Sequence, residues 1–251
     1  MSDHRNRVRF VDHWTTHTGS DHRALFVHVQ IRRRLFGPWR DLLLVSCNMG
    51  GHFSRSDLAA LAVEVKGIGI PAVMAVQEAG DQHWLSFAAT RYGLTFLAGD
   101  GHSGQASTPT LLWPGVKVKR TQWLLTLARR VIGKGAGPDR NKAKWADCNR
   151  LVVAGAPFGA TSVHFIASQQ NPGRMKAARE QADATVRVAK AAHYPLFCIG
   201  DTNSDDDQPL SDWLRAHGMT SNHRELGEIP THGRRSIDAV LVRADMVGGA
   251  L

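Results

Sequence analysis

Polar side chains that could do chemistry follow several short apolar segments of this chain. Those at or near the end of such a segment are Asn48, Glu78, His164, Asp201 and Asn203. Asp238 lies inside an apolar segment, where a carboxylate is costly to bury unless it is paired or binds a metal. Strand ends are a common place for a sheet to gather polar groups into a site. These residue types are suited to metal ligation and proton transfer.

Each of these residues also has an ordinary structural explanation. Glu78 could be a surface residue after a strand, and His164 could be a core histidine with satisfied hydrogen bonds. Asp201 and Asn203 could be turn residues, since Asp and Asn favour turns by themselves. Asp238 is harder to explain in this way, because its flanking residues are apolar. The whole set in this order favours a site.

The elements that must position these residues alternate between strand and helix patterns. Leu25, Val27, Val29 and Ile31 alternate with other residues, which predicts a strand. A second strand is predicted over 41–47, joined to the first by a hairpin near Gly37. Further strands are predicted over 7–11, 72–77, 95–98, 110–113, 151–154, 161–166, 196–199 and 236–242. Helices are predicted from Ser54 to about Lys66, over 172–192 and over 209–217. No feature marks a boundary, so we expect one α/β or α+β domain.

Positive charge is concentrated in one part of the chain. The 251 residues carry a formal net charge of +9. Ten Lys and Arg residues lie between Val116 and Arg150, against Asp139 and Asp147 alone, and the rest of the chain is nearly neutral. A basic block on a neutral body suggests a polyanionic partner, although it could also be a solvated loop.

Composition excludes several other classes of protein. No apolar run approaches the roughly 18–20 residues that span a bilayer, so we expect no membrane partner. The first residues are polar and do not resemble a signal peptide. The three cysteines, Cys47, Cys148 and Cys198, lack the spacing of a zinc site. Free thiols and a cytoplasmic location are expected.

Taken in order, the motifs resemble those of the endonuclease/exonuclease/phosphatase superfamily, the fold of deoxyribonuclease I. The segments that carry this resemblance are Ser46-Cys47-Asn48, Gln77-Glu78, Ser162-Val163-His164, Gly200-Asp201-Thr202-Asn203 and Arg235-Ser236-Ile237-Asp238. Asn149-Arg150 resembles the phosphate-contacting arginine motif of the nuclease branch. The resemblance implies a four-layered α/β/β/α sandwich of two packed mixed β-sheets. Thr202 and Ala239 stand where the family has aromatic residues, which leaves substrate preference in doubt.

The family's last motif, Ser-Asp-His before a final strand, is found at the wrong end of the chain. Only ten residues follow Leu241, whereas Ser20-Asp21-His22 precedes the strand pattern of residues 25–31. The chain therefore resembles a circularly permuted member of the family. Residues 1–31 would be the displaced final strands, 32–40 a joining hairpin, and 41–251 the main body. We expect a monomer, with a swapped dimer as the rival.

The resemblance implies phosphodiester hydrolysis assisted by Mg²⁺, with Mn²⁺ as a substitute. Glu78, Asp21 and Asn48 would hold the metal, which hard oxygen ligands favour. Asp201 would orient or deprotonate the attacking water, and Asn203 would hold the phosphate. His164 would donate a proton, and His22 would pair with Asp238. Whether His22, His164 or Asp201 is the general base stays open.

The basic block favours nucleic acid as the substrate, with DNA ahead of RNA, because it would displace counterions from a phosphate backbone. Lys142, Lys144 and Arg150 are the expected contacts. Two alternatives remain. One is a phosphatase or phosphodiesterase for a small or lipid phosphoester. The other is a catalytically inactive nucleic-acid-binding module, which the complete set of site residues disfavours.

Overall fold

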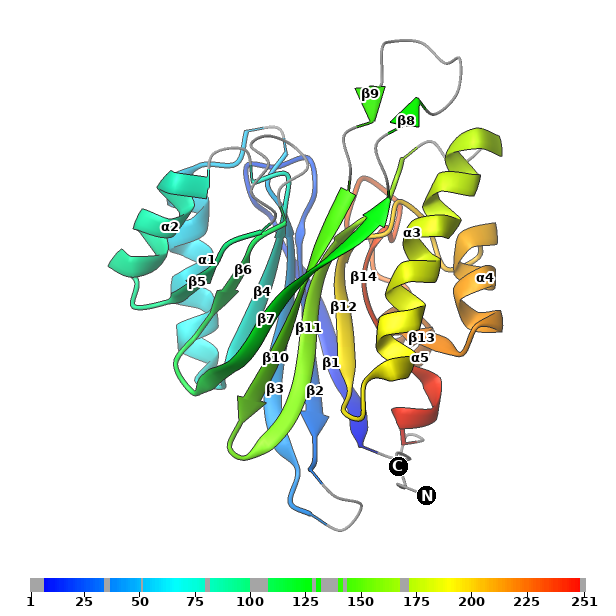
Figure 1. Ribbon diagram of the computed structural model, residues 1–251. Helices are drawn as coiled ribbons and strands as arrows, with labels where there is room; N and C mark the ends of the chain where they lie inside the picture. Colours follow the sequence, from blue (N-terminus) through cyan, green and yellow to red (C-terminus); the bar gives the residue numbers. More distant parts are fainter. Residues whose placement is uncertain are drawn as a thin grey trace.

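Two six-stranded sheets pack face to face, and helices cover their outer faces (Figure 1). This computed structural model describes residues 7–33, 37–50, 52–79, 82–99, 108–127, 130–131, 140–141, 144–167 and 172–248. Helices α1 and α2 cover one sheet, and α3 and α4 cover the other (Figure 1). The protein is therefore the four-layered α/β/β/α sandwich that the motifs implied.

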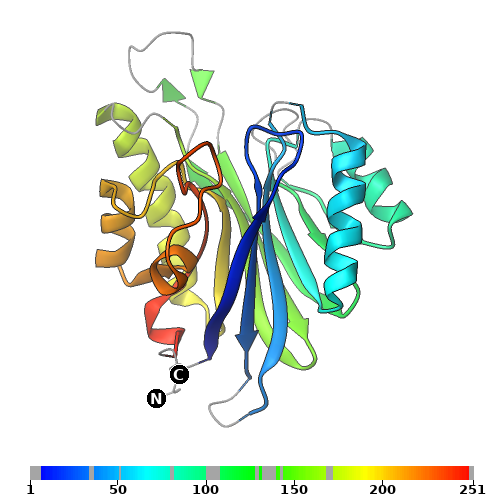
Figure 2. The ribbon, with the colours of Figure 1, turned by 180° about the vertical axis from the view of Figure 1, so that it is seen from behind.

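The first sheet contains the N-terminal strands. Its strand order is β1-β2-β3-β4-β6-β5, and only β3 and β4 run parallel. The strand bounds are β1 Val8–Thr16, β2 Ala24–Ile31, β3 Arg40–Asn48, β4 Ala72–Gln77, β5 Thr95–Leu97 and β6 Thr110–Leu112. Figure 2 shows β1 extending beside β2 from the chain ends to the opposite end of the sandwich.

The second sheet contains the later strands. Its order is β13-β14-β12-β11-β10-β7, with β11 and β12 parallel. The bounds are β7 Val116–Leu127, β10 Lys144–Val153, β11 Ala156–His164, β12 Leu196–Asp201, β13 Met219–Ser221 and β14 Asp238–Arg243. A small hairpin, β8 Arg130–Val131 with β9 Arg140–Asn141, extends from the end of this sheet (Figure 1).

The helices follow from caps and amphipathic patterns. Their bounds are α1 Arg55–Ile68, α2 Gln82–Arg91, α3 Pro172–Ala191, α4 Pro209–Ala216 and α5 Asn222–Leu226, with a 3₁₀ turn at Ala244–Met246. The Ser54 hydroxyl accepts a hydrogen bond from the Asp57 backbone N–H, and the Asp57 carboxylate accepts one from the Ser54 backbone N–H. This reciprocal capping box starts α1 where the sequence predicts it. Gly69, in the left-handed conformation, ends α1.

The main core lies between the two sheets. Leu25, Val27 and Val29 of β2 face Phe158 and Val240 of the opposite sheet in one fully buried cluster. The alternate residues Phe26 and Leu43 turn to the other face and pack under α1 and α2. Successive side chains of a strand point to opposite faces of the sheet. One set therefore packs against the other sheet, and the alternate set packs against the helices.

Sequence patterns located most elements but not their full lengths. The strand 72–77 and the helix starting at Pro172 are confirmed almost to the residue. The strand expected at residues 7–11 is longer, because pairing with β2 continues to Thr16. The elements that were not predicted are helices α2 and α5 and strands β7, β8, β9 and β13. No helix in the described ranges is long and apolar enough to cross a membrane.

Candidate active site

Strand β12 ends on the side of the sandwich opposite the termini (Figure 1), and three side chains from distant parts of the chain meet there. Asp201 ends β12 and Asp238 begins β14, and the two residues are paired across the strands. His22, from the loop before β2, donates from Nδ1 to Oδ2 of Asp238 at 2.8 Å. Its Nε2 lies 3.8 Å from Oδ2 of Asp201. One chain therefore brings His22 to Asp238 without a partner subunit.

The two carboxylates determine the charge of His22. Burial alone would lower the pKa of the imidazole, but the hydrogen bond and charge of Asp238 outweigh it. The charges of Asp201 and Asp21 act in the same direction, and the pKa of His22 is raised to about 9. Burial and the nearby Asp238 also raise the pKa of Asp201 well above the usual range of a carboxyl group. His22 is consequently a cation at neutral pH and a hydrogen-bond donor to an anion.

His164, at the end of β11, joins this group from the neighbouring strand. Its Nε2 lies 3.6 Å from Oε1 of Glu78 and 3.8 Å from Oδ2 of Asp201. The His164 side chain is 13% exposed and that of Glu78 is 23% exposed, so both can reach a bound molecule from inside the site. An imidazole between two carboxylates can move a proton or donate to a phosphate oxygen.

The three predicted metal ligands converge around Gly50. A Cβ atom placed on Gly50 would lie 3.0 Å from Oε2 of Glu78, 3.2 Å from Oδ1 of Asn48 and 3.5 Å from Oδ1 of Asp21. Three oxygens from three separate loops therefore border one small space, which glycine leaves open. Two carboxylates and an amide oxygen form the hard donor set that Mg²⁺ and Mn²⁺ favour. The residues present are suited to such an ion.

Asn48 also links the metal ligands to Asp201. Its side-chain nitrogen donates to Oδ2 of Asp201 at 3.3 Å, and its oxygen accepts from the Gly50 backbone at 2.9 Å. The amide orientation is thereby fixed, with the oxygen directed toward the Glu78 side. Strand β3 ends here and places Asn48 beside Gln77 of β4 in register.

Unusual backbone conformations orient two of the site residues. Glu78 and Asn203 have φ angles of 53° and 52°, in the left-handed region that non-glycine residues rarely adopt. Such conformations persist where surrounding contacts enforce them, and they are frequent at functional sites. The Asn203 backbone donates to Oδ1 of Asp201 at 2.7 Å, and its amide donates to the Phe165 carbonyl at 2.9 Å. Asn203 therefore ties the loop after β12 to the end of β11.

A buried polar network under the site joins the two sheets. Gln77 of β4 donates to Ser162 of β11 at 3.1 Å, and Ser162 donates to the Val76 carbonyl at 2.9 Å. The Ser46 hydroxyl lies 3.2 Å from Oε1 of Gln77 and 3.3 Å from Oδ1 of Asp238. Because every member is fully or almost fully buried, this network holds the two sheets in one position relative to each other along the strand direction.

Of the three predicted substrate contacts, only Arg150 has a described side chain, and it lies away from this group. Arg150 pairs in register with Gly159, five residues before His164 on the neighbouring strand. At about 3.3 Å per residue, it lies roughly 16 Å from the site along the sheet. Lys142 lies outside the described residues. Lys144 begins β10 at the site end of the sandwich, and only its backbone is described.

His232 is a site residue that the sequence did not single out. Its Nε2 lies 3.6 Å from Oδ2 of Asp21, and its ring lies 4.6 Å from the ring of His22, centroid to centroid. Asp21, His22 and His232 could together hold a metal ion. Nothing in the local sequence separates His232 from the other histidines. A weak signal is its position in the loop that leads into Asp238.

Comparisons with known proteins agree with this geometry at the level of the fold. No model of a known protein family matches the chain, and no curated protein sequence matches it. Among solved structures, TDP2 from D. rerio bound to a single-strand DNA product has a TM-score of 0.60 at 14% identity. The match covers 80% of this chain and 82% of that one.

Two bacterial structures are similar to the same degree. The endonuclease/exonuclease/phosphatase from Bacteroides vulgatus has a TM-score of 0.56 at 14% identity, with 80% of this chain and 86% of that chain covered. The mannosyl-6-phosphatase Bt3783 from Bacteroides thetaiotaomicron has a TM-score of 0.55 at 14% identity, with 80% and 84% covered. This chain therefore has the fold of the endonuclease/exonuclease/phosphatase superfamily, as its motifs implied.

Proposed function

We propose that this protein is a Mg²⁺-dependent phosphodiester hydrolase, and most specifically a nuclease that cleaves DNA. The observation that carries the proposal is the convergence of Glu78, Asn48 and Asp21 around one space next to the His22, Asp201 and Asp238 group. A metal site beside two imidazoles and a buried carboxylate contains the groups that hydrolysis of a phosphodiester needs.

The charge of each side chain indicates its role in the proposed reaction. Glu78, Asp21 and Asn48 would hold the ion, which would neutralise negative charge on the phosphate. Asp201 orients the attacking water and takes its proton. The raised pKa of Asp201 suits a base near neutral pH, since proton transfer works best when the pKa is close to the operating pH. We assign His22 to phosphate binding instead, because the hydrogen bond and charge of Asp238 raise the pKa of its imidazole and favour the cation.

The two imidazoles act on the phosphate and the leaving group. His22, held by Asp238, donates to a phosphate oxygen. His164, between Glu78 and Asp201, protonates the leaving oxygen or donates to the phosphate. Asn203 holds the loop that carries Asp201 and contributes to phosphate binding. Each role follows from where the side chain lies relative to the oxygens of Glu78, Asn48 and Asp21.

A long polyanion explains the basic segment better than a small phosphoester does. The β8–β9 hairpin extends from the site end of the sandwich and belongs to this segment (Figure 1). Arg150 and Arg120 are directly opposite on β10 and β7, where like charges repel. Among the described residues, no carboxylate forms an ion pair with either arginine, and Arg150 lies over the Tyr194 ring, 5.3 Å from its centroid.

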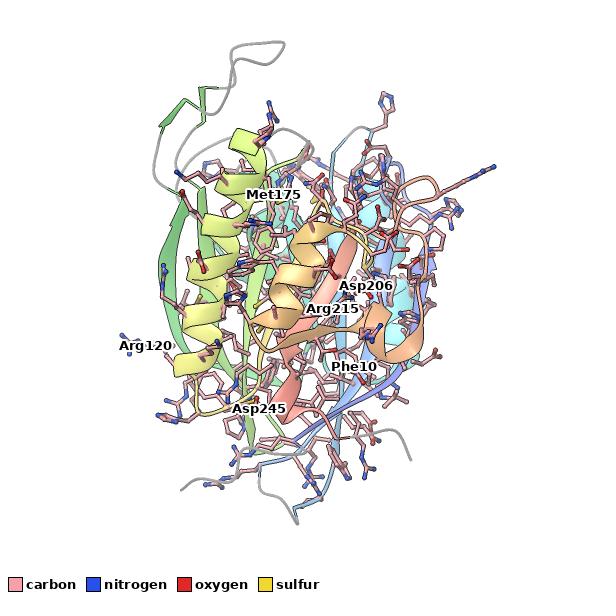
Figure 3. The ribbon with its side chains drawn as sticks, turned by 90° about the vertical axis from the view of Figure 1, so that its right-hand side faces the viewer. Phe10, Arg120, Met175, Asp206, Arg215 and Asp245 are labelled. Carbon is pink, nitrogen blue, oxygen red and sulfur yellow. The ribbon has the colours of Figure 1, made fainter. Side chains whose placement is uncertain are left out.

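These two arginines also line a cavity of about 180 Å³ with Asn149 and Tyr194. Figure 3 shows Arg120 at the sheet edge, away from Met175 near the start of α3. Because Arg120 and Arg150 lie so far from the candidate active site, they can contact only a substrate that extends along the protein surface. The phosphate backbone of DNA has that length, and we assign Arg150, Lys142 and Lys144 to contacts with it.

The deciding experiment is nicking of a supercoiled plasmid with Mg²⁺, with Mn²⁺ and with chelator. Glu78→Gln keeps the side-chain shape and removes a metal charge, so activity should fall by at least about 10²–10³-fold. Glu228→Gln, the same change at an exposed glutamate in the loop after α5, is the matched control and should be unaffected. Thermal unfolding checks that both variants fold.

Each alternative has its own outcome. Near-normal nicking by folded Glu78→Gln would rule out the metal assignment. Hydrolysis of bis(p-nitrophenyl) phosphate without plasmid cleavage would favour a small phosphoester as the substrate. Plasmid binding without any cleavage in Mg²⁺ or Mn²⁺ would identify an inactive binding module.

A further inference from the structure

Asp21 borders two different groups of ligand atoms with its two oxygens. Its Oδ1 lies on the side of Glu78 and Asn48, 3.5 Å from the Cβ position of Gly50. Its Oδ2 lies 3.6 Å from Nε2 of His232. A carboxylate can bind a different cation through each oxygen, so the atoms beyond Oδ2 define a second candidate site.

That second group contains nitrogen as well as oxygen. Asp21, His22 and His232 each offer one ligand atom, and the three atoms lie within 4.8 Å of one another. Two of these three ligand atoms are imidazole nitrogens, whereas Glu78, Asn48 and Asp21 offer only oxygens to the first site. Imidazole nitrogen favours Zn²⁺ and similar transition-metal ions, whereas Mg²⁺ favours oxygen alone.

The backbone holds the two histidines in place before any ion arrives. Residues 22 and 232 form an antiparallel bridge, and the Arg23 backbone donates to the Thr231 carbonyl at 2.7 Å. Thr231 in turn accepts the Asp238 backbone N–H at its hydroxyl, at 3.0 Å. The loop that carries His232 is therefore anchored to the residues directly before β2 and to β14, and this anchoring keeps the two tilted rings 4.6 Å apart.

The contact between His22 and Asp238 gives one ring the arrangement found at many metal sites. To bind an ion, His22 must first release the proton on Nε2 to solvent. Nδ1 then still donates to Asp238 at 2.8 Å, and the lone pair of Nε2 is directed away from that carboxylate. A carboxylate behind a metal-binding histidine fixes its tautomer and makes it a better ligand. Asp238 is fully buried and cannot be displaced easily by water.

We propose that Asp21, His22 and His232 form a second cation site, selective for Zn²⁺ or a similar transition-metal ion over Mg²⁺. Two imidazoles and a carboxylate with an open position form a common zinc ligand set. His232 is 39% exposed at its side chain and Asp21 is 63% exposed, so an ion can enter from solvent. If the proposed hydrolysis is correct, zinc at this site inhibits it, because His22 and Asp21 are then shared with the second ion.

The test is calorimetric titration of Zn²⁺ into the full chain without a histidine tag. We expect one tight site, and we expect His232→Ala to weaken it by at least about tenfold. His28→Ala is the matched control, because His28 also pairs with a carboxylate, that of Asp41 at 2.9 Å, but lies farther along β2. Equal zinc affinity in His232→Ala and wild type would overturn the proposal.

Two further measurements keep the result separate from folding and from catalysis. His232→Asp retains a ligand but replaces nitrogen with oxygen, and should shift the affinity ratio toward Mg²⁺. The visible absorption of bound Co²⁺ should change in this variant, because it reports the ligand atoms. Glu78→Gln should lose hydrolysis but keep the zinc site. Loss of the tight zinc site in folded Glu78→Gln would contradict a set of ligands that excludes Glu78.

Discussion

His22 lies between two buried carboxylates, and this position makes its protonation part of the folding equilibrium. The folded protein raises the pKa of His22 from 6.5 to about 9. A protonated imidazole is therefore more stable in the folded state than in the unfolded one. The stabilising contribution is fully present below about pH 6.5 and is lost as the pH rises through about 9.

We expect the imidazole signals of His22 to titrate near pH 9 in NMR spectra recorded with chelator present. Asp238→Asn should lower that pKa, because Asp238 supplies the hydrogen bond and the nearest charge. The free energy of unfolding of the wild type should fall between about pH 6.5 and 9, and the variant should fall less. Titration of His22 near 6.5 in the wild type would contradict the pairing.

The cysteines give a second prediction for single residues. Cys47 and Cys198 are buried and free, and burial raises the pKa of both thiols. Since only the thiolate reacts readily, both should resist a thiol reagent at pH 8 in the folded protein. Unfolding in guanidinium should expose three reactive thiols per chain. Fast labelling of Cys47 or Cys198 in the native state would mean that the sheets open locally.

Gly200 determines how closely β11 and β12 can pair near the site. Its φ angle is 148°, and a Cβ atom there would lie 2.0 Å from the Val163 carbonyl oxygen and 2.9 Å from Nε2 of Gln77. Both contacts are too short for any side chain. The glycine before Asp201 is therefore required by the strand pairing and by the Gln77 network at the same time.

Gly200→Ala should lower the free energy of unfolding by clearly more than about 1 kcal/mol, because strain and close contacts add. The matched change is Gly67→Ala, near the end of α1, where a new Cβ meets nothing within 4 Å. That variant should be more stable by about 0.5–1 kcal/mol, since alanine favours helix more than glycine does. Urea unfolding measures both. A neutral Gly200→Ala would disprove the close approach.

The basic segment would contact DNA over much of the length of the molecule. It extends from the edge strand β7 to the end of the sandwich that carries the candidate active site. Neutralising Lys142 and Lys144 should weaken DNA binding for all sequences alike. The slope of log K against log salt should become less negative by about 0.9 for each lost phosphate contact. An unchanged slope would mean that these lysines only solvate the loop, and a small phosphoester would then become the better substrate hypothesis.

The first and last described residues, Arg7 and Gly248, lie side by side, which bears on the proposed circular permutation. The Arg7 backbone donates to the Met246 carbonyl at 2.8 Å, and the Gly248 backbone donates to the Val8 carbonyl at 2.9 Å. Both ends lie at the same corner of the sandwich (Figure 2). The chain could therefore be closed there by a short linker without moving a strand.

If the order of the chain is a rearrangement, a protein cut in the 32–40 hairpin and closed between residues 248 and 7 should fold. It should keep the site, because every site residue keeps its strand. Its melting temperature and plasmid nicking should be close to those of the wild type. Deleting residues 1–23 instead removes β1, Asp21 and His22, and should abolish activity. Failure of the closed chain to fold would contradict the proposal.

The sequence determined the elements and most of the site. Period-two and helical patterns located β2, β4, α3 and α4, because the burial of one face is recorded directly in residue order. The motif residues Asn48, Glu78, His164 and Asp201 were singled out from their places at strand ends, and Asp238 from its place inside an apolar segment. This worked because each lies next to its own strand, and strand ends meet at one end of a sheet.

Only the tertiary structure decided which distant residues touch. Residues 22 and 238 are 216 positions apart, and no local pattern can place an imidazole 2.8 Å from that carboxylate. His232 joins the site through a backbone bridge to residue 22, which depends on how two loops meet. Arg150 lies in a strand, as its sequence pattern predicts, but away from the candidate active site. The register of β10 and β11 places it beside Gly159, five residues before His164. Local sequence specifies which face of a strand each side chain lies on and where the strand ends. The register of the strands and the packing between the sheets specify the distances between residues that are far apart in the chain.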